Sequence, residues 1–309
     1  MDKKTIVFIV GMGHSGSTIM DKSMGNIDGC FSYGELVNLS KVIRQNNYCT
    51  CGKKITDCSF WNSVNKSLER NFDKSLQKNP DKFFFRIPFK KHIFNLILCK
   101  RETQIVKLFS DHTQAIYDYT FKKGFNVLID SSKDIFRVLL LKKHLSKQYD
   151  IRIIHLIRNP VDVTNSYLKS HSKVKYPGMK DFQTYSRNSV TGSTPKSTFS
   201  IILRWISKNI LITFVFKIFF RKNKYQIVRF ENVIEDVQMF NKMLVGLDLG
   251  SVNKISLNSK VTHIVTGNAS RYSDSIKLNS GPLHISTAKK KLIQITTWPI
   301  YAYYRKRSI

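Results

Sequence analysis

The stretch that most constrains this chain is Ile6–Met24, which reads IVFIVGMGHSGSTIMDKSM. Its apolar residues Ile6 to Val10 predict a short buried strand, and the glycine-rich loop that follows leads into a helical period of apolar side chains. A strand, a glycine-rich loop and a helix form a phosphate cradle, because backbone N–H groups approach the anion and the positive end of the helix dipole faces it. We therefore expect an anion-binding loop at this point.

The loop departs at one position from the P-loop pattern Gly-x-x-x-x-Gly-Lys-[Ser/Thr]. Gly11 and Gly16 have the required spacing and Thr18 fits the last position, but Ser17 stands where the pattern has lysine. The sequence shows no clear Walker B strand and no obvious carboxylate set for Mg²⁺, which argues against an ATPase or a kinase. A P-loop kinase-like phosphotransferase with a degenerate lysine stays open as an alternative.

The charge balance favours an anionic partner. The 309 residues carry 51 Lys and Arg against 21 Asp and Glu, a formal net charge of +30. This charge suits an anionic co-substrate or an acidic membrane surface, so a non-enzymatic polyanion-binding or membrane-binding protein is a second alternative. An alternative explanation for the excess of basic residues is a proteome that is rich in lysine throughout. No nucleic-acid motif with interleaved aromatic residues is present, so we expect no specific nucleic acid.

The sequence predicts a cytoplasmic protein, with peripheral attachment to a membrane as a variant. The N-terminus has a basic start, but its apolar run is short and broken by glycines, unlike that of a secretory signal. The most apolar stretch, Ile210–Phe220, is too short to span a bilayer and contains Lys217. It favours a core helix over a membrane anchor.

Alternating strands and helices predict the fold class. Strands are expected at 5–10, 126–130, 151–157 and 225–230, and helices at 17–25, 35–43, 135–145, 161–171, 201–220 and 231–247. This order predicts an α/β protein with the three-layer fold of P-loop NTPases, in which helices flank a central parallel sheet. We expect a single domain over residues 1–309, with a helical, cysteine-containing insertion at about 45–124 and an acceptor-side loop at about 173–200.

Polar residues follow two of the predicted strands, where the active-site groups of an open α/β sheet are expected. Lys133 follows the strand 126–130, and Arg158 follows the strand 151–157, with Ser166 two turns into the next helix. A lysine there stabilises negative charge on a transferred group, and an arginine offers phosphate a fork of donors. Separate anion sites at 13–18 and at Arg158 with Ser166 suggest a nucleotide with phosphates at both ends of its ribose.

Two further side chains have alternative interpretations. Glu35 precedes a predicted helix, where a carboxylate is either a general base or an ordinary first-turn residue favoured by the helix dipole. Position alone does not separate the two. His155 lies inside a buried strand, and we expect a hydrogen-bonded core histidine there.

Cys49, Cys51 and Cys58 form a Cys-x-Cys-x6-Cys cluster. The chain has five cysteines, an odd number that excludes a fully paired disulfide framework within one chain. Three thiols and one further ligand can hold zinc, but this spacing is not a standard zinc pattern. We therefore favour a disulfide or free structural thiols and predict no metal site.

Together these motifs resemble the PAPS-dependent sulfotransferase family, where PAPS is 3′-phosphoadenosine 5′-phosphosulfate. The run Gly13-His14-Ser15-Gly16-Ser17-Thr18 is similar to the loop that binds the 5′-phosphosulfate, with His14 where the usual form has Arg or Lys. Arg158-Asn159-Pro160-x-Asp162 with Ser166 is similar to the 3′-phosphate motif. Secondary similarities fall in family order across residues 5–272: Gly34-Glu35-Leu36, Cys49/Cys51/Gly52, Cys58/Phe60/Trp61, Asp130 to Lys133, Val228 to Glu231, and Gly267-Asn268 with Arg271.

The resemblance implies a metal-independent, in-line transfer of the sulfuryl group from PAPS to an acceptor hydroxyl or amine. It makes Glu35 the general base and Lys133 the residue that steadies the transferring sulfate. Arg158 and Ser166 would hold the 3′-phosphate, with Arg271 assisting. We expect His14 to donate one hydrogen bond or to carry a proton. The acceptor class stays open among glycan, lipid, small molecule and protein tyrosine, and residues 83–100 and 181–195 are the candidate acceptor-side segments.

Overall fold

The computed structural model describes residues 4–71, 104–168, 171–174, 183–186, 197–256, 263–264, 266–272 and 285–309. The strands are β1 (Thr5–Gly11), β2 (Cys30–Ser32), β3 (Val127–Asp130), β4 (Asp150–Ile157), β5 (His171–Val174), β6 (Gln183–Ser186) and β7 (Tyr225–Arg229). The α-helices are α1 (Ser17–Gly25), α2 (Leu39–Arg44), α3 (Ser59–Asn71), α7 (Gln104–Phe121), α8 (Ile135–Leu145), α9 (Pro160–Leu168), α11 (Thr198–Phe219), α12 (Phe230–Glu235), α13 (Val237–Gly246) and α14 (Thr287–Arg307). Short 3-10 helices are η1 (Leu36–Asn38), η2 (Lys222–Lys224) and η3 (Ala269–Tyr272).

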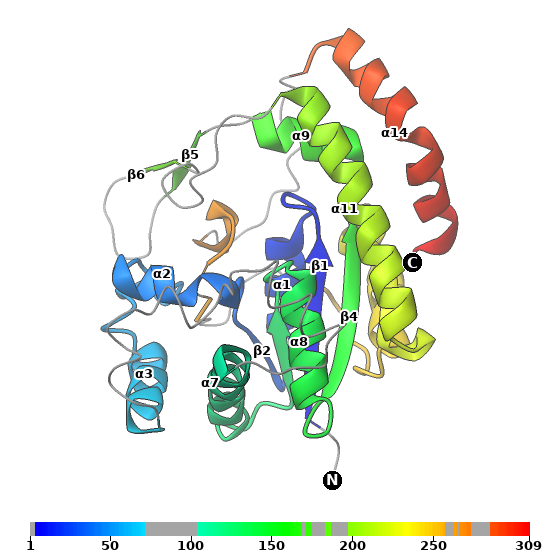
Figure 1. The fold of residues 1–309 in the computed structure, drawn as a ribbon. Coiled ribbons are helices and arrows are strands. Elements are labelled where there is room, and N and C mark those ends of the chain that lie inside the picture. The colour runs from blue at the N-terminus through cyan, green and yellow to red at the C-terminus, as the bar shows by residue number, and fades with distance from the viewer. Residues whose placement is uncertain are drawn as a thin grey trace.

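A parallel sheet forms the centre of the molecule, with strand order β2-β3-β1-β4-β7 (Figure 1). β1 pairs in parallel with β3 on one side, Thr5 opposite Val127, and with β4 on the other, Thr5 opposite Asp150. β2 and β7 extend the sheet in the same direction. Because the strands are parallel, the loops that follow β1, β3, β4 and β7 lie at one edge of the sheet.

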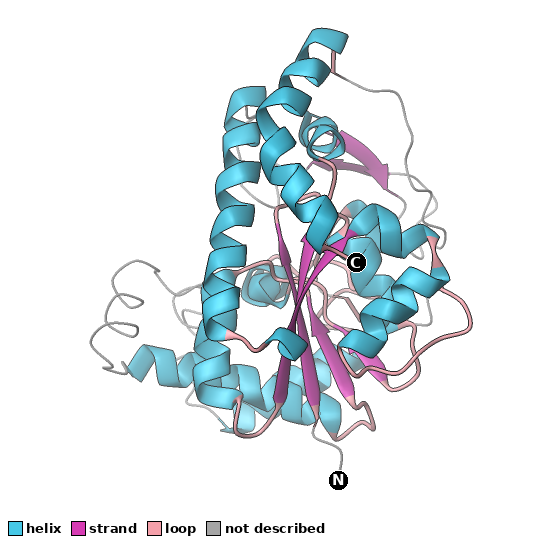
Figure 2. Ribbon diagram, turned by 90° about the vertical axis from the view of Figure 1, so that its right-hand side faces the viewer, coloured by secondary structure: helices cyan, strands magenta, loops and turns pink. Residues whose placement is uncertain are grey.

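Helices cover both faces of this sheet (Figure 2). Ile6, Phe8 and Val10 of β1 belong to a core that includes residues of α7, α8 and α11. Val7 and Ile9 belong to a second core with residues of α1, α12 and α13. All residues of β1 are buried, as expected for a central parallel strand covered on both faces. The predicted α/β fold, with three layers and a central parallel sheet, is confirmed.

His155 lies in β4 and is fully buried. Its Nδ1 atom is 3.0 Å from the Tyr225 hydroxyl, and its Nε2 atom is 3.1 Å from Oδ1 of Asn209. Burial lowers the pKa of His155 to about 3, so the imidazole is neutral. The prediction of a hydrogen-bonded core histidine is confirmed.

Three predicted helices differ from the structure. The helix expected at 231–247 is divided, because the Asp236 side chain accepts hydrogen bonds from the backbone N–H groups of Gln238 and Met239 and so caps a new helix, α13. The helix expected from Glu35 starts as the 3-10 helix η1, and α2 begins only at Leu39. His171, expected at the end of a helix, is the first residue of β5, which pairs antiparallel with β6.

Other elements were not predicted. β2 is a three-residue strand beside β3, too short for a sequence pattern to reveal. The basic runs at 289–291 and 305–307 belong to the single helix α14, which lies alongside α11 (Figure 1). The first candidate acceptor-side segment, 83–100, lies outside the described residues. Of the second, 181–195, the structure describes only residues 183–186.

Candidate functional site

The loop between β1 and α1 is held by close packing around its glycines. Gly16 has a φ of 88° and lies at the N-cap of α1, where a Cβ atom would come within 2.4 Å of the Phe230 ring. A Cβ on Gly13 would lie 2.4 Å from the Tyr167 hydroxyl oxygen. Gly16 gives α1 no side-chain cap, and the first turn has no acidic residue. The N-terminal N–H groups of α1 therefore suit an external anion.

The hydroxyl groups of this loop differ in their environments. Ser15 and Ser17 are buried, and within the described residues Ser15 Oγ has no hydrogen-bond partner. A buried hydroxyl normally has a partner, so this atom fits a ligand that would supply one. Thr18 Oγ1 accepts a hydrogen bond from the backbone N–H of Asn268 at 3.1 Å.

His14 connects the loop to the second predicted anion site. Its Nδ1 atom is 2.9 Å from Ser166 Oγ, and its carbonyl oxygen accepts a hydrogen bond from Arg158 Nη1 at 3.2 Å. The His14 ring packs edge-on against Tyr167, with the ring centroids 4.1 Å apart. The structure thus brings together His14, Arg158 and Ser166, and the two predicted anion sites adjoin.

Arg158 is positioned by groups on two helices, α11 and α12. Its carbonyl oxygen accepts a hydrogen bond from Trp205 Nε1 at 3.2 Å, and its guanidinium lies over the Phe230 ring at 5.2 Å from the centroid. The next residue, Asn159, donates its N–H to Glu231 Oε1 at 2.6 Å, and its own Oδ1 accepts from the N–H of Val161. The start of α9 and the arginine before it are therefore fixed together.

A buried carboxylate fixes the turn after β3. Asp130 Oδ2 accepts hydrogen bonds from Arg137 Nε at 3.1 Å and from the Tyr117 hydroxyl at 3.3 Å. Its Oδ1 accepts from the N–H and the hydroxyl of Ser132. Ser132 Oγ in turn accepts from the N–H of Val37 at 3.0 Å. This network ties the turn that carries Lys133 to the helix that follows Glu35.

Glu35 and Lys133 form an ion pair at the edge of the sheet. Lys133 Nζ donates to Glu35 Oε1 at 2.5 Å. The Lys133 side chain is 14% exposed and the Glu35 side chain 24%. Asn38 Nδ2 donates to the other oxygen, Oε2, at 3.0 Å. The pair is thus oriented but still reached by solvent, as groups that act on a substrate must be.

Backbone strain coincides with these side chains. His14 has a φ of 69° and Lys133 a φ of 58°, two of the four non-glycine residues with positive φ in the described part of the chain. A left-handed conformation at a non-glycine residue is uncommon and is concentrated at functional sites. This observation singles out His14 and Lys133 independently of any motif.

The segment 266–272 closes the site from the far end of the chain. Glu35 donates its N–H to the Thr266 carbonyl at 3.0 Å, and Thr266 Oγ1 donates to the Glu35 carbonyl at 2.9 Å. Arg271 is buried, and two of its donors go to the Gly267 carbonyl and to the Tyr272 hydroxyl, each at 2.7 Å. Arg271, expected to assist at a phosphate, therefore braces the Gly267-Asn268 turn.

Lys208 of α11 is a site residue that sequence reasoning missed. Burial and the nearby charges of Lys133 and Arg204 lower the pKa of Lys208, while Asp134 and Glu35 raise it, and the net result is a pKa of about 8. The lysine therefore lies within electrostatic reach of the Glu35–Lys133 pair. It is one of several basic residues in an apolar helix, and no motif surrounds it.

Comparisons with known proteins give similar structures but no sequence relative. No family model and no curated protein matches the chain. The sulfotransferase domain from the curacin biosynthetic pathway is similar over 95% of this chain and 97% of that one, at 12% identity and a TM-score of 0.47. The sulfotransferase domain from the Synechococcus PCC 7002 olefin synthase is similar over 96% of this chain and 97% of that one, at 15% identity and a TM-score of 0.44.

Asp21, in α1 beneath the loop, gives the site a pH-dependent component of stability. It is fully buried and accepts a hydrogen bond from Ser32 Oγ. Burial raises its pKa to about 7, and the charge of Asp130 raises it too, against hydrogen bonds from Ser32 and Ser131 and the charge of Lys133. The folded state therefore holds a proton on Asp21 that the unfolded state releases near pH 4.

We predict that Asp21→Asn removes a loss of stability that occurs as the pH rises from about 4 to about 7. The unfolding free energy of Asp21→Asn minus that of the wild type should grow across this window, by on the order of 4 kcal/mol, and then level off. Urea unfolding at several pH values measures this difference. Asp28→Asn, at an exposed position just after α1, is the control. A difference that does not change with pH would contradict the assignment.

Proposed function

We propose that this protein is a sulfotransferase that moves the sulfuryl group of PAPS to an acceptor hydroxyl or amine. The observation that carries the proposal is the junction at His14, where the N-terminal loop of α1 meets Arg158 and Ser166. A helix N-terminus without the P-loop lysine lies next to the half-buried Arg158. This arrangement suits a nucleotide with one anionic group at each end of its ribose.

The roles follow from the placement of the side chains. The backbone of residues 13–18 would bind the 5′-phosphosulfate, and Arg158 with Ser166 the 3′-phosphate. Lys133 and Lys208 would face the sulfuryl group, since an anion between them relieves their mutual repulsion. Glu35 would take the proton of the acceptor hydroxyl as the new S–O bond forms and the bond to the phosphate oxygen breaks. Adenosine 3′,5′-bisphosphate then leaves.

We predict that Arg158→Ala weakens the binding of adenosine 3′,5′-bisphosphate at least tenfold, because a hydrogen-bonded charge contributes about 1.5–3 kcal/mol. The loss should be much smaller for adenosine 5′-monophosphate, which lacks the 3′-phosphate. Titration calorimetry with both nucleotides measures the difference between the two losses of affinity. Arg221→Ala, exposed after the end of α11, is the matched control and should bind both as the wild type does.

Two results would count against the donor assignment. If Arg158→Ala lost affinity for both nucleotides equally, Arg158 would not contact the 3′-phosphate. If the wild type were stabilised against heating by ATP with Mg²⁺ but not by adenosine 3′,5′-bisphosphate, the sulfotransferase proposal would fail in favour of a phosphotransferase.

We predict that Glu35→Gln lowers turnover of PAPS about 100-fold or more, the usual contribution of a general base, with nucleotide affinity within about threefold of wild type. The release of adenosine 3′,5′-bisphosphate in the presence of a panel of phenol, sugar and amine acceptors measures turnover. Glu235→Gln, exposed at the end of α12, should leave the rate unchanged. Normal turnover by Glu35→Gln would show that another group takes the proton.

We further propose that the protein works at an acidic membrane surface, on the cytoplasmic side. α11 is the one helix of the described chain long and apolar enough to cross a membrane, but one face of it packs in the core. Its other face and that of α14 expose large apolar side chains: Phe199, Leu203, Ile210, Leu211, Phe214, Ile218, Phe219, Leu292, Ile295 and Trp298.

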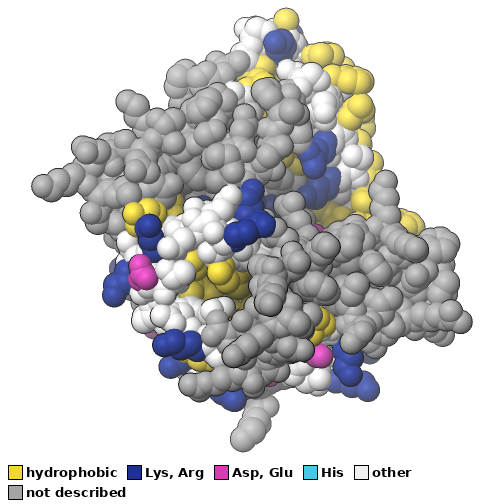
Figure 3. Space-filling view, turned by 60° about the vertical axis from the view of Figure 1, so that its left-hand side comes forward, with side chains coloured by type: hydrophobic (Ala, Val, Ile, Leu, Met, Phe, Trp, Pro, Cys, Tyr) yellow, Lys and Arg dark blue, Asp and Glu magenta, His cyan; other side chains and the backbone are white. Residues whose placement is uncertain are grey.

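Charge complementarity favours a lipid surface as the occupant of this apolar face. Exposed basic residues lie at the ends of both helices, Arg221 and Lys222 after α11 and the run 305–307 in the last turn of α14. Among the described residues on the face drawn in Figure 3, Lys and Arg side chains recur and acidic side chains are few. Apolar side chains beside cations are the pattern of proteins that bind anionic lipid.

We predict that the protein sediments with phosphatidylglycerol vesicles and not with phosphatidylcholine vesicles. The double substitution Phe214→Gln and Ile218→Gln should lower this binding at least tenfold, since each large apolar side chain that becomes buried in the lipid contributes about 1.5–3 kcal/mol. Val245→Gln, a 59% exposed position on α13, is the control. If the protein bound no vesicles, the proposal would fail and the apolar face would have no lipid partner. If the protein formed a dimer that the double substitution abolished, the face would instead bind a second copy of the chain.

A further inference from the structure

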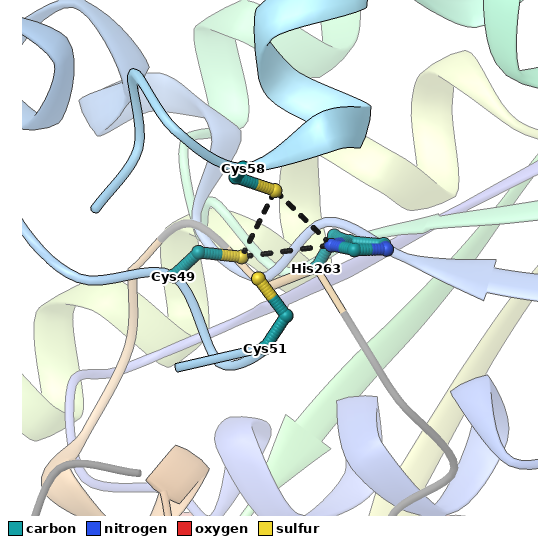
Figure 4. Close-up of side chains that lie close together, drawn as sticks. All are labelled: Cys49, Cys51, Cys58 and His263. Atoms are coloured by element: carbon teal, nitrogen blue, oxygen red, sulfur yellow. Dashed lines mark hydrogen bonds between the residues drawn. The ribbon is translucent and has the colours of Figure 1, made fainter. Parts of the chain in front are cut away.

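Four side chains with metal-binding atoms converge outside the transfer site. They are Cys49, Cys51 and Cys58 of the loop between α2 and α3, and His263, which lies 205 residues beyond Cys58 (Figure 4). All four ligand atoms lie within 4.8 Å of one another. Because His263 is so distant in sequence, the spacing of the cysteines alone could not reveal this set.

Three distances within the cluster, those among Cys49, Cys58 and His263, are close to the edges of a zinc tetrahedron. Zn–S bonds of about 2.3 Å and Zn–N bonds of about 2.0–2.1 Å place two sulfurs about 3.8 Å apart and a sulfur and a nitrogen about 3.6 Å apart. Cys49 Sγ and Cys58 Sγ are 3.7 Å apart. His263 Nδ1 is 3.7 Å from Cys49 Sγ and 3.2 Å from Cys58 Sγ.

The same distances exclude the disulfide that the sequence favoured as one alternative. A disulfide needs sulfurs about 2.05 Å apart, and Cys49, Cys51 and Cys58 are all free. Each of the three sulfurs instead accepts a hydrogen bond from a backbone N–H group. The N–H of Cys51 donates to the Cys49 sulfur, that of Lys53 to the Cys51 sulfur, and that of Trp61 to the Cys58 sulfur. Such N–H groups stabilise metal-bound thiolates.

Neighbouring groups hold the histidine in place. Trp61 Nε1 donates to the His263 carbonyl at 2.8 Å, and the Phe60 ring stacks on the imidazole with the centroids 5.2 Å apart. The N–H of Ile264 donates to Thr50 Oγ1 at 2.9 Å. The imidazole therefore faces the thiols as a fixed part of the fold.

We propose that Cys49, Cys51, Cys58 and His263 bind a structural zinc ion. Three thiolates and one imidazole form a closed tetrahedral set, with no position for water or substrate. Cys49 and Cys58 are buried and the other two ligands are half-buried, which suits a structural site. The ion would tie the loop 49–58 to the segment whose residues Thr266 and Asn268 contact Glu35 and Thr18.

Metal analysis of the full chain tests the proposal. The protein is expressed without a histidine tag, purified without chelators and examined by native mass spectrometry and elemental analysis. We expect about one zinc ion per chain. Exchange with Co²⁺ should give the intense visible bands of a tetrahedral site and near-ultraviolet charge-transfer bands from thiolate to cobalt. A wild-type chain that carries no zinc and takes up no Co²⁺ in this form would overturn the proposal, whatever its variants do.

Variants assign the ligands. Cys58→Ser and His263→Ala should lose zinc, whereas His263→Cys should retain it because thiolate replaces imidazole in such sites. Cys30→Ser, a substitution of the buried cysteine of β2, is the matched control and should bind zinc as the wild type does. Retention of zinc by both Cys58→Ser and His263→Ala, or its loss from Cys30→Ser, would refute this ligand set.

Discussion

Because β1 pairs in parallel with β3 on one side and β4 on the other, three strands deliver their carboxyl ends to one edge of the sheet. The glycine loop follows β1, the turn with Lys133 follows β3, and Arg158 follows β4. Residues that are far apart in the sequence therefore meet without any local signal that brings them together. The side chains of the candidate site are positioned by backbone pairing first and by their own hydrogen bonds second.

The balance of charge at this edge suits an anion. The charges of Lys133 and Arg204 lower the pKa of Lys208, and the acidic groups of Glu35 and Asp134 oppose them. Arg158 adds a further cation over the Phe230 ring. Bringing cations together costs free energy that a bound anion recovers. The net charge of +30 is therefore in part a local property of this site as well as a general property of the surface.

Much of the fold could be predicted from the sequence, because β1, β3, β4 and β7 are apolar runs bounded by glycine or polar residues. The division of α12 from α13 could not, since one capping carboxylate, Asp236, decides it. For the site, the glycine loop, Glu35, Lys133, Arg158 and Ser166 were found from motifs at strand ends. Lys208 and His263 were missed for a common reason, because only the fold brings each to its neighbours: Lys208 to the Glu35–Lys133 pair, and His263 to cysteines that precede it by more than 200 residues.

The hydrogen bond from the Asn268 N–H to Thr18 Oγ1 joins residues 250 positions apart. During synthesis, the glycine loop and α1 emerge early, but their partner from this turn arrives only after the whole sheet has been made. Contacts of such large sequence separation form late in folding, because the entropy of closing the loop must be overcome first. The candidate anion site of the nascent chain thus stays unfinished until the turn at Asn268 has been made.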